Sequence, residues 1–238
     1  ETESTAALFA PIRDLARAVE DAPVEQLEEA LAPYLDLRTY ITHIAIDNVL
    51  SEPDGLLGNL GMSNFYLYRF EEQALSRMIV WDQDLAFEDL DLPTPSKNFD
   101  INLLAQKVWA SPELRATYLR ALGEVTLSIG PPAGTPEVED PSARRCPAPP
   151  GQPVCGWLED AVFRQDAQIR EAALADPWTP HGREQFEEGI EFLKRFARER
   201  GRIVRQYVSQ IDPGIVAASA GESSDTLRTR SRQVRRPK

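Results

Sequence analysis

The 238-residue sequence predicts an α+β fold that is mainly helical, with one small β-hairpin near its middle. Three observations lead to this prediction. Apolar residues recur at helical spacing over most of the chain. Two short segments rich in aromatic and β-branched residues stand close together between the helical regions. The composition, 42% hydrophobic and 27% charged, is typical of a globular chain.

Three helices are expected before the hairpin. Leucine, isoleucine and valine fall on one helical face over residues 8–19 and again over residues 24–31. A longer helix is expected to begin after Asp36, because an aspartate is a favourable N-cap. It should end at residues 51–55 (SEPDG), which form a strong turn signal.

The hairpin is expected from residues 64–69 (NFYLYR) and 77–81 (RMIVW), which are separated by a polar segment. An acidic stretch follows the second strand, and Pro-rich residues from about 130 to 156 are expected to form a long loop. The remaining helices are predicted over residues 103–108, 114–122, 158–174 and 182–211.

The chain is acidic, with 26 Lys plus Arg against 38 Asp plus Glu and a net charge of −12. Residues 228–238 hold six of the cations, so residues 216–238 are expected to be a disordered basic tail. Binding to nucleic acid depends on cation contacts with phosphate, so the acidic body disfavours a nucleic-acid partner. No apolar run approaches the roughly 18 residues of a membrane-spanning helix.

The two cysteines, Cys146 and Cys155, lie nine residues apart in the Pro-rich segment, with no histidine nearby. They cannot complete the four-ligand set of a structural zinc site. A disulfide that closes this loop is the favoured interpretation, and two free cysteines remain the alternative. A disulfide would favour a secreted, periplasmic or cell-envelope protein.

Four polar residues around the hairpin are candidates for chemistry: Asp54, Asn64, Asp82 and Asp84. A hairpin brings its outer ends together, so Asn64 and Asp82 should be neighbours. Amide and carboxylate oxygens are the ligands that Mg²⁺ prefers. Taken singly, each residue also has an ordinary structural role, as a turn, a strand start or a helix cap.

These residues belong to three motifs in a fixed order: Asp54-Gly55, Asn64–Tyr68 (NFYLY) and Trp81–Phe87 (WDQDLAF). Together they resemble the CotH (spore coat protein H-like) kinase family. Residues 192–208 also look like the C-terminal helix of that family, so the resemblance spans most of residues 36–211.

The resemblance implies an atypical protein-kinase-like fold, of which residues 1–215 would be the C-terminal lobe. It implies ATP- and Mg²⁺- or Mn²⁺-dependent phosphorylation of Ser or Thr in a protein substrate. By position, Asp54 matches the catalytic aspartate, which orients or deprotonates the acceptor hydroxyl. Asn64 and Asp82 match the metal-binding residues, and Asp84 is a further metal contact.

The sequence departs from the kinase pattern at its N-terminus. It opens on Glu1 instead of Met, and its first lysine is Lys97. A strand-rich lobe carrying a lysine over the nucleotide is therefore expected to be absent, and to belong to the same, longer polypeptide. The alternative function is a non-catalytic, pseudokinase-like structural or interaction protein of the cell envelope or surface. A carbohydrate hydrolase is poorly supported, because Asp82 and Asp84 would face opposite ways on a continued strand.

Overall fold

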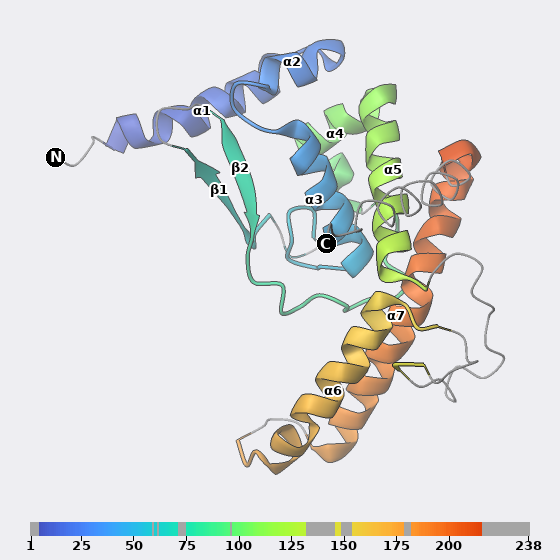
Figure 1. The fold of residues 1–238 in the computed structure, drawn as a ribbon. Coiled ribbons are helices and arrows are strands. Elements are labelled where there is room, and N and C mark those ends of the chain that lie inside the picture. The colour runs from blue at the N-terminus through green and yellow to red at the C-terminus, as the bar shows by residue number, and fades with distance from the viewer. Residues whose placement is uncertain are drawn as a thin grey trace, which may run out of the picture. The chain divides into compact units, whose positions relative to one another are not determined.

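A computed structural model describes residues 5–58, 60, 62–70, 75–95, 97–131, 146–148, 154–178 and 182–215. The chain divides into two compact units, Glu1–Leu122 and Gly123–Lys238. Helices dominate both, and one two-stranded antiparallel sheet lies in the first unit (Figure 1). The prediction of a mainly helical α+β fold with a small hairpin is therefore confirmed.

The helices of the first unit lie close to the predicted ranges. They are α1 (Thr5–Asp21), the 3₁₀ turn η1 (Val24–Gln26), α2 (Leu27–Leu31), α3 (Leu37–Leu50), the 3₁₀ turn η2 (Lys97–Asp100), α4 (Leu103–Ala110) and most of α5 (Pro112–Ile129). The sequence predicted a single helix over residues 24–31. The structure has η1 followed by α2, because Gln26 leaves the helical region at φ −113° and ψ 8°.

Helix α3 is the central helix of this unit. Asp36 caps its first turn, where its carboxylate accepts a hydrogen bond of 3.0 Å from the Thr39 backbone N–H. Hydrogen bonds from Thr39 lower the pKa of Asp36, because they favour the charged carboxylate. Buried residues lie all around α3 and include apolar and polar side chains, as expected of a helix surrounded by other elements.

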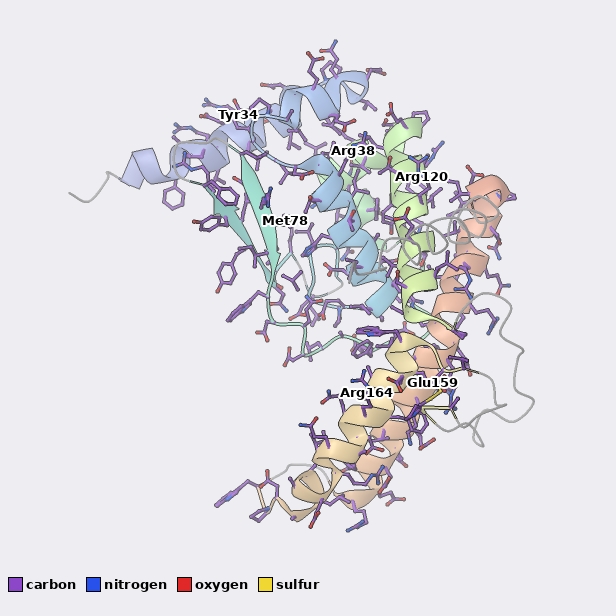
Figure 2. The ribbon with its side chains drawn as sticks, in the orientation of Figure 1. Tyr34, Arg38, Met78, Arg120, Glu159 and Arg164 are labelled. Carbon is purple, nitrogen blue, oxygen red and sulfur yellow. A yellow bond between two sulfur atoms is a disulfide. The ribbon has the colours of Figure 1, made fainter. Side chains whose placement is uncertain are left out.

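The hairpin consists of β1 (Phe65–Arg69) and β2 (Ser76–Val80), within one residue of the predicted bounds. Its register pairs Phe65 with Val80 and Arg69 with Ser76. The Ser76 N–H donates a hydrogen bond of 2.7 Å to the carbonyl of Tyr34, which lies just before α3. This bond attaches β2 to the segment between α2 and α3. Figure 2 labels Tyr34 of that segment and Met78 of β2.

The second unit is built on α6 (Trp157–Ala175) and α7 (Arg183–Ile211), which pack against each other. Between them, Arg198 Nε lies 2.5 Å from Glu159 Oε1, in an ion pair that is almost completely buried. Cys146 and Cys155 form a disulfide, as predicted, and it lies beside Glu159 near the start of α6 (Figure 2).

Two predictions fall wholly or largely outside the described residues. The basic tail over residues 216–238 lies there, as does most of the Pro-rich segment over residues 130–156. Among the helices that the structure describes, none combines the length and the apolar character needed to cross a bilayer.

Candidate active site

Asp54 lies in a tight turn that follows the C-terminus of α3. Ser51 ends the helix in the left-handed conformation, at φ 57°, and the chain then folds back on itself. The Leu60 N–H bonds to the Pro53 carbonyl at 2.7 Å and so closes the turn around Asp54. Gly58 is required there, because a Cβ would lie 2.1 Å from the Pro53 carbonyl oxygen.

Two buried acidic side chains hold this turn from within. Asp47, on the last turns of α3, accepts a hydrogen bond of 3.2 Å from the Leu56 N–H through Oδ2. Glu52 accepts one of 3.3 Å from the Asp54 N–H through Oε1. The backbone N–H of Glu52 in turn bonds to the Asp47 carbonyl at 3.0 Å. The position of the Asp54 backbone thus depends on both carboxylates.

Burial changes the pKa of Glu52. The Glu52 side chain belongs to a residue that is only 2% exposed. Burial above all, together with the hydrogen bond and charge of Asp54 and the charge of Asp47, raises the pKa of Glu52 to about 8. His43 lies on the other side, with Nε2 3.3 Å from Asp47 Oδ2.

Asn64 and Asp82 are neighbours at the open end of the hairpin. The Trp81 N–H donates to the Asn64 carbonyl at 3.2 Å, which extends the pairing one step beyond Phe65 and Val80. The Asn64 side chain donates through Nδ2 to the Asp82 carbonyl at 2.8 Å. Both residues have positive φ angles, 54° and 50°, so each strand bends sharply where the site begins.

A further hydrogen bond connects this hairpin end to the turn of Asp54. The Ser63 hydroxyl, next to Asn64 in the chain, donates to the Asp54 carbonyl at 2.7 Å. Asp84 begins a turn after β2, and this turn returns the chain to α3 where the Phe87 N–H bonds to the Leu50 carbonyl at 2.7 Å. Asp82 and Asp84 are both exposed. Strand β2 ends at Val80, so the two aspartates do not alternate along a strand.

The carboxylates of Asp54, Asp82 and Asp84 do not converge into one tight set. Among the described residues, one group of three acidic, Cys or His side chains has its ligand atoms within 4.8 Å of one another: Cys146, Cys155 and Glu159. Both of its sulfur atoms belong to the disulfide, so they are not available as thiolate ligands. The structure therefore brings Asn64 and Asp82 together, whereas Asp54, Asp82 and Asp84 do not form a group of three with ligand atoms within 4.8 Å of one another.

A cavity of about 390 Å³ lies under the turn of Asp54, lined by the C-terminal part of α3 and the segment after the hairpin. Asp47 and Glu52 contribute to it from one side, and Glu88 and Asp89 from the other. The Asp89 N–H bonds to the Ser51 hydroxyl at 3.0 Å, which holds the two sides together.

Sequence reasoning missed the involvement of Asp47 and Glu52. The turn signal over residues 51–55 includes Glu52 without indicating its burial, and none of the three motifs includes Asp47. One signal was available for Asp47, which together with Asn48 interrupts the otherwise apolar run of α3 from Ile44 to Val49. An acid within a buried helix needs a polar partner, and here the backbone N–H of Leu56 donates to Asp47 Oδ2, with His43 Nε2 3.3 Å from the same oxygen.

These features define a mainly helical α+β protein with an acidic turn and a polar hairpin end, joined by backbone and side-chain hydrogen bonds. The sequence matches the family model described as CotH kinase protein over residues 1–129. The match covers more than half of the chain, so the protein belongs to the CotH kinase family, whose members are kinase-like transferases at the level of the family. No curated protein matches the chain.

The match contains all four predicted site residues and ends at the last residue of α5. Helices α6 and α7 lie outside it. The similarity of residues 192–208 to the C-terminal helix of the family therefore stays a prediction.

Proposed function

We propose that residues 1–215 form the catalytic C-terminal lobe of an ATP- and divalent-metal-dependent protein Ser/Thr kinase of the CotH type. One observation carries this proposal. Asp54, Asn64 and Asp82 occur in the family's order within the matched segment, and hydrogen bonds connect Asp54 through Ser63 to the hairpin end where Asn64 meets Asp82.

In this proposal Asp54 acts on the acceptor hydroxyl. An aspartate in hydrogen-bonding reach of a Ser or Thr hydroxyl orients it and accepts its proton during transfer. The backbone N–H and carbonyl of Asp54 are held by Glu52 and Ser63. The side chain therefore projects from a braced backbone, as positioning of an acceptor requires.

Asn64, Asp82 and Asp84 would hold Mg²⁺ or Mn²⁺. Their chemistry fits these ions, which take carboxylate and amide oxygens as ligands. Asn64 uses its Nδ2 for the Asp82 carbonyl, and among the described residues no hydrogen bond occupies its Oδ1, which could take a cation. Within the described part of the chain, neither the Asp82 nor the Asp84 carboxylate takes part in a hydrogen bond or ion pair. A bound cation would supply neutralisation of phosphate charge, which an acidic chain needs in order to accept ATP.

The nucleotide also needs a covering lobe with a lysine. The described residues before Asn64 include no strand, and the first lysine of the chain is Lys97. We propose that another part of the same polypeptide provides this lobe. The protein substrate would carry a Ser or Thr acceptor.

The proposed location is outside the cytoplasm, in the cell envelope or secreted. The disulfide between Cys146 and Cys155 supports it, because such bonds persist mainly in oxidising compartments.

The test is transfer of labelled γ-phosphate from ATP to a serine-rich acceptor such as dephosphorylated casein, using the full-length polypeptide. Asp54→Ala should lower kcat by roughly 10²–10⁴-fold, because the acceptor loses its base. Asp82→Ala should remove the dependence of the rate on Mg²⁺ or Mn²⁺ and most of the rate itself.

Asp91→Asn is the matched control, since Asp91 is an exposed acid on the same segment that has no proposed role. It should leave the rate unchanged. Equal transfer by the unsubstituted protein and by Asp54→Ala and Asp82→Ala would contradict the proposed function.

The second candidate is a non-catalytic, pseudokinase-like protein of the cell envelope or surface, since Asp54, Asp82 and Asp84 are not among the described groups of three side chains with ligand atoms within 4.8 Å of one another. It predicts no phosphate transfer and nucleotide binding no better than background in the full-length polypeptide.

A further inference from the structure

Glu52 and Asp54 present two buried carboxyl oxygens toward the interior of the same turn. Glu52 uses Oε1 to accept the Asp54 N–H, at 3.3 Å. Its second oxygen, Oε2, is buried and has no hydrogen-bond partner within the described residues, and the same holds for Asp54 Oδ1. Each atom left in this state costs free energy, since a buried carboxylate oxygen has lost its water.

The charges around the pair do not relieve this cost. The titratable groups that face Glu52 are Asp54 on its own turn, Asp47 on α3, and Glu88 and Asp89 on the segment beyond the hairpin. No lysine or arginine is among the described residues that line the cavity. A basic side chain, that of His43, lies beside Asp47, with its Nε2 3.3 Å from Asp47 Oδ2.

A single proton satisfies both oxygens. We propose that Glu52 is a positioning residue that remains protonated at neutral pH and donates its carboxyl proton to the Asp54 carboxylate. Glu52 then holds Asp54 twice, accepting from its backbone N–H and donating to its side chain. The part of this inference that concerns catalysis rests on the proposed function, whereas the shared proton does not.

The electrostatic environment supports the proton's position. Burial, the hydrogen bond with Asp54, and the negative charges of Asp54 and Asp47 raise the pKa of Glu52 to about 8. Two carboxyl groups in contact cannot both ionise without strong repulsion, and Asp54 is the member of the pair that must be ionised to accept a proton from a hydroxyl.

The arrangement has a consequence at alkaline pH. The folded protein holds this proton more tightly than the unfolded chain, where an ordinary glutamate titrates near 4.5. The stability that Glu52 contributes is therefore complete below about pH 4.5 and is lost as the pH rises to about 8. Above it, the proton leaves to solvent, two adjacent carboxylates repel, and Asp54 loses its side-chain donor.

The first test needs no enzymatic activity. The side-chain carboxyl carbons of the 238-residue chain, labelled with ¹³C at glutamate, are titrated by NMR. We expect one glutamate to titrate with a midpoint near pH 8, assigned to Glu52 by its absence from Glu52→Gln. Completion of every glutamate titration below about pH 6 would overturn the inference.

Glu52→Gln also tests the predicted pH dependence of stability. Its amide oxygen can still accept the Asp54 N–H, but the group no longer ionises. The unsubstituted chain should lose stability toward urea between about pH 4.5 and 8, and Glu52→Gln should lose clearly less. Glu88→Gln, an exposed acid at the same cavity, should behave as the unsubstituted chain does. Parallel pH dependence in all three would overturn the inference.

The kinetic arm separates the two proposals. In the full-length polypeptide, kcat should fall above about pH 8, and this alkaline limb should be absent in Glu52→Gln, with little change in the KM for ATP. An alkaline limb that persists in Glu52→Gln would overturn the positioning role. A protein that shows no transfer but does show the Glu52 titration would contradict the proposed function and leave the shared proton established.

Discussion

The hydrogen atom of Gly55 leaves room for two acidic side chains that a methyl group would displace. A Cβ at this position would lie 2.7 Å from Asp47 Oδ2 and 2.9 Å from Glu52 Cγ. Both side chains are buried and each accepts a backbone N–H of the turn. Neither can move aside without losing that hydrogen bond, so the glycine next to Asp54 is needed for close packing.

Gly55→Ala should therefore lower the free energy of unfolding by about 1–3 kcal/mol, as overpacking of a tight site does. Urea denaturation followed by circular dichroism measures it. Gly189→Ala is the matched control, because an added Cβ there meets no atom within 4 Å and the residue lies within α7. It should be neutral or stabilising by up to about 1 kcal/mol. Equal effects of the two substitutions would contradict the packing argument.

At the scale of elements, a lysine of α4 caps the C-terminus of α1. Lys107 on α4 donates from Nζ to the carbonyls of Val19, Glu20 and Ala22, at 2.7, 2.9 and 2.6 Å. Carbonyls at a helix C-terminus have no partner within the helix, and a cation is favourable there. One side chain thus connects two helices that are more than 80 residues apart in sequence.

Lys107→Met keeps the aliphatic stem and removes the ammonium. It should destabilise the chain by about 1–3 kcal/mol, because three carbonyls lose a charged donor, two of them in partly buried hydrogen bonds. Arg38→Gln removes an exposed ion pair with Glu28, and should cost at most about 1 kcal/mol. Urea denaturation of both variants, with hydrogen exchange of the α1 amides, measures the difference. A loss for Lys107→Met no greater than for Arg38→Gln would contradict the capping role.

At the scale of the whole molecule, the two units differ in what stabilises them. The first unit contains the candidate site and nearly all of the family match. The second contains the disulfide, which lies near the start of α6, and the buried ion pair between Glu159 of α6 and Arg198 of α7. A covalent restraint in the second unit should therefore leave the site of the first unchanged.

Removal of the disulfide should destabilise the second unit by about 2–3 kcal/mol, since the unfolded chain regains the entropy of an open loop. The double variant Cys146→Ser, Cys155→Ser and the reduced unsubstituted chain should unfold at the same lower urea concentration. The Glu52 titration should not change in either. A double variant whose stability still responds to reductant, or equals that of the oxidised chain, would contradict this prediction.

Much of the fold follows from patterns that are local in sequence. Apolar spacing predicted α1, α3, α6 and α7, because a helix buries one face at a fixed period. The hairpin followed from two β-branched and aromatic segments, and its pairing brings Asn64 beside Asp82. The family motifs could also be recognised, because each consists of residues that are adjacent in sequence.

The partners of Asp54 could not be predicted in this way. The burial of Glu52 arises because α3 ends in a left-handed residue and the segment after the hairpin returns to it, where Phe87 bonds to the Leu50 carbonyl and Asp89 to Ser51. An acid in a turn signal is ordinarily solvated, and nothing in its immediate neighbours marks it as buried.

The amino-acid order thus accounts for the helices, the hairpin, the disulfide and the membership of the CotH kinase family, since each depends on residues near one another in the chain or on a recognisable motif. Three-dimensional packing accounts for the buried Asp47 and Glu52 and for the cap that Lys107 places on α1. The physical reason is that desolvation and long-range hydrogen bonds depend on segments up to about 90 residues apart, whose meeting no local pattern encodes.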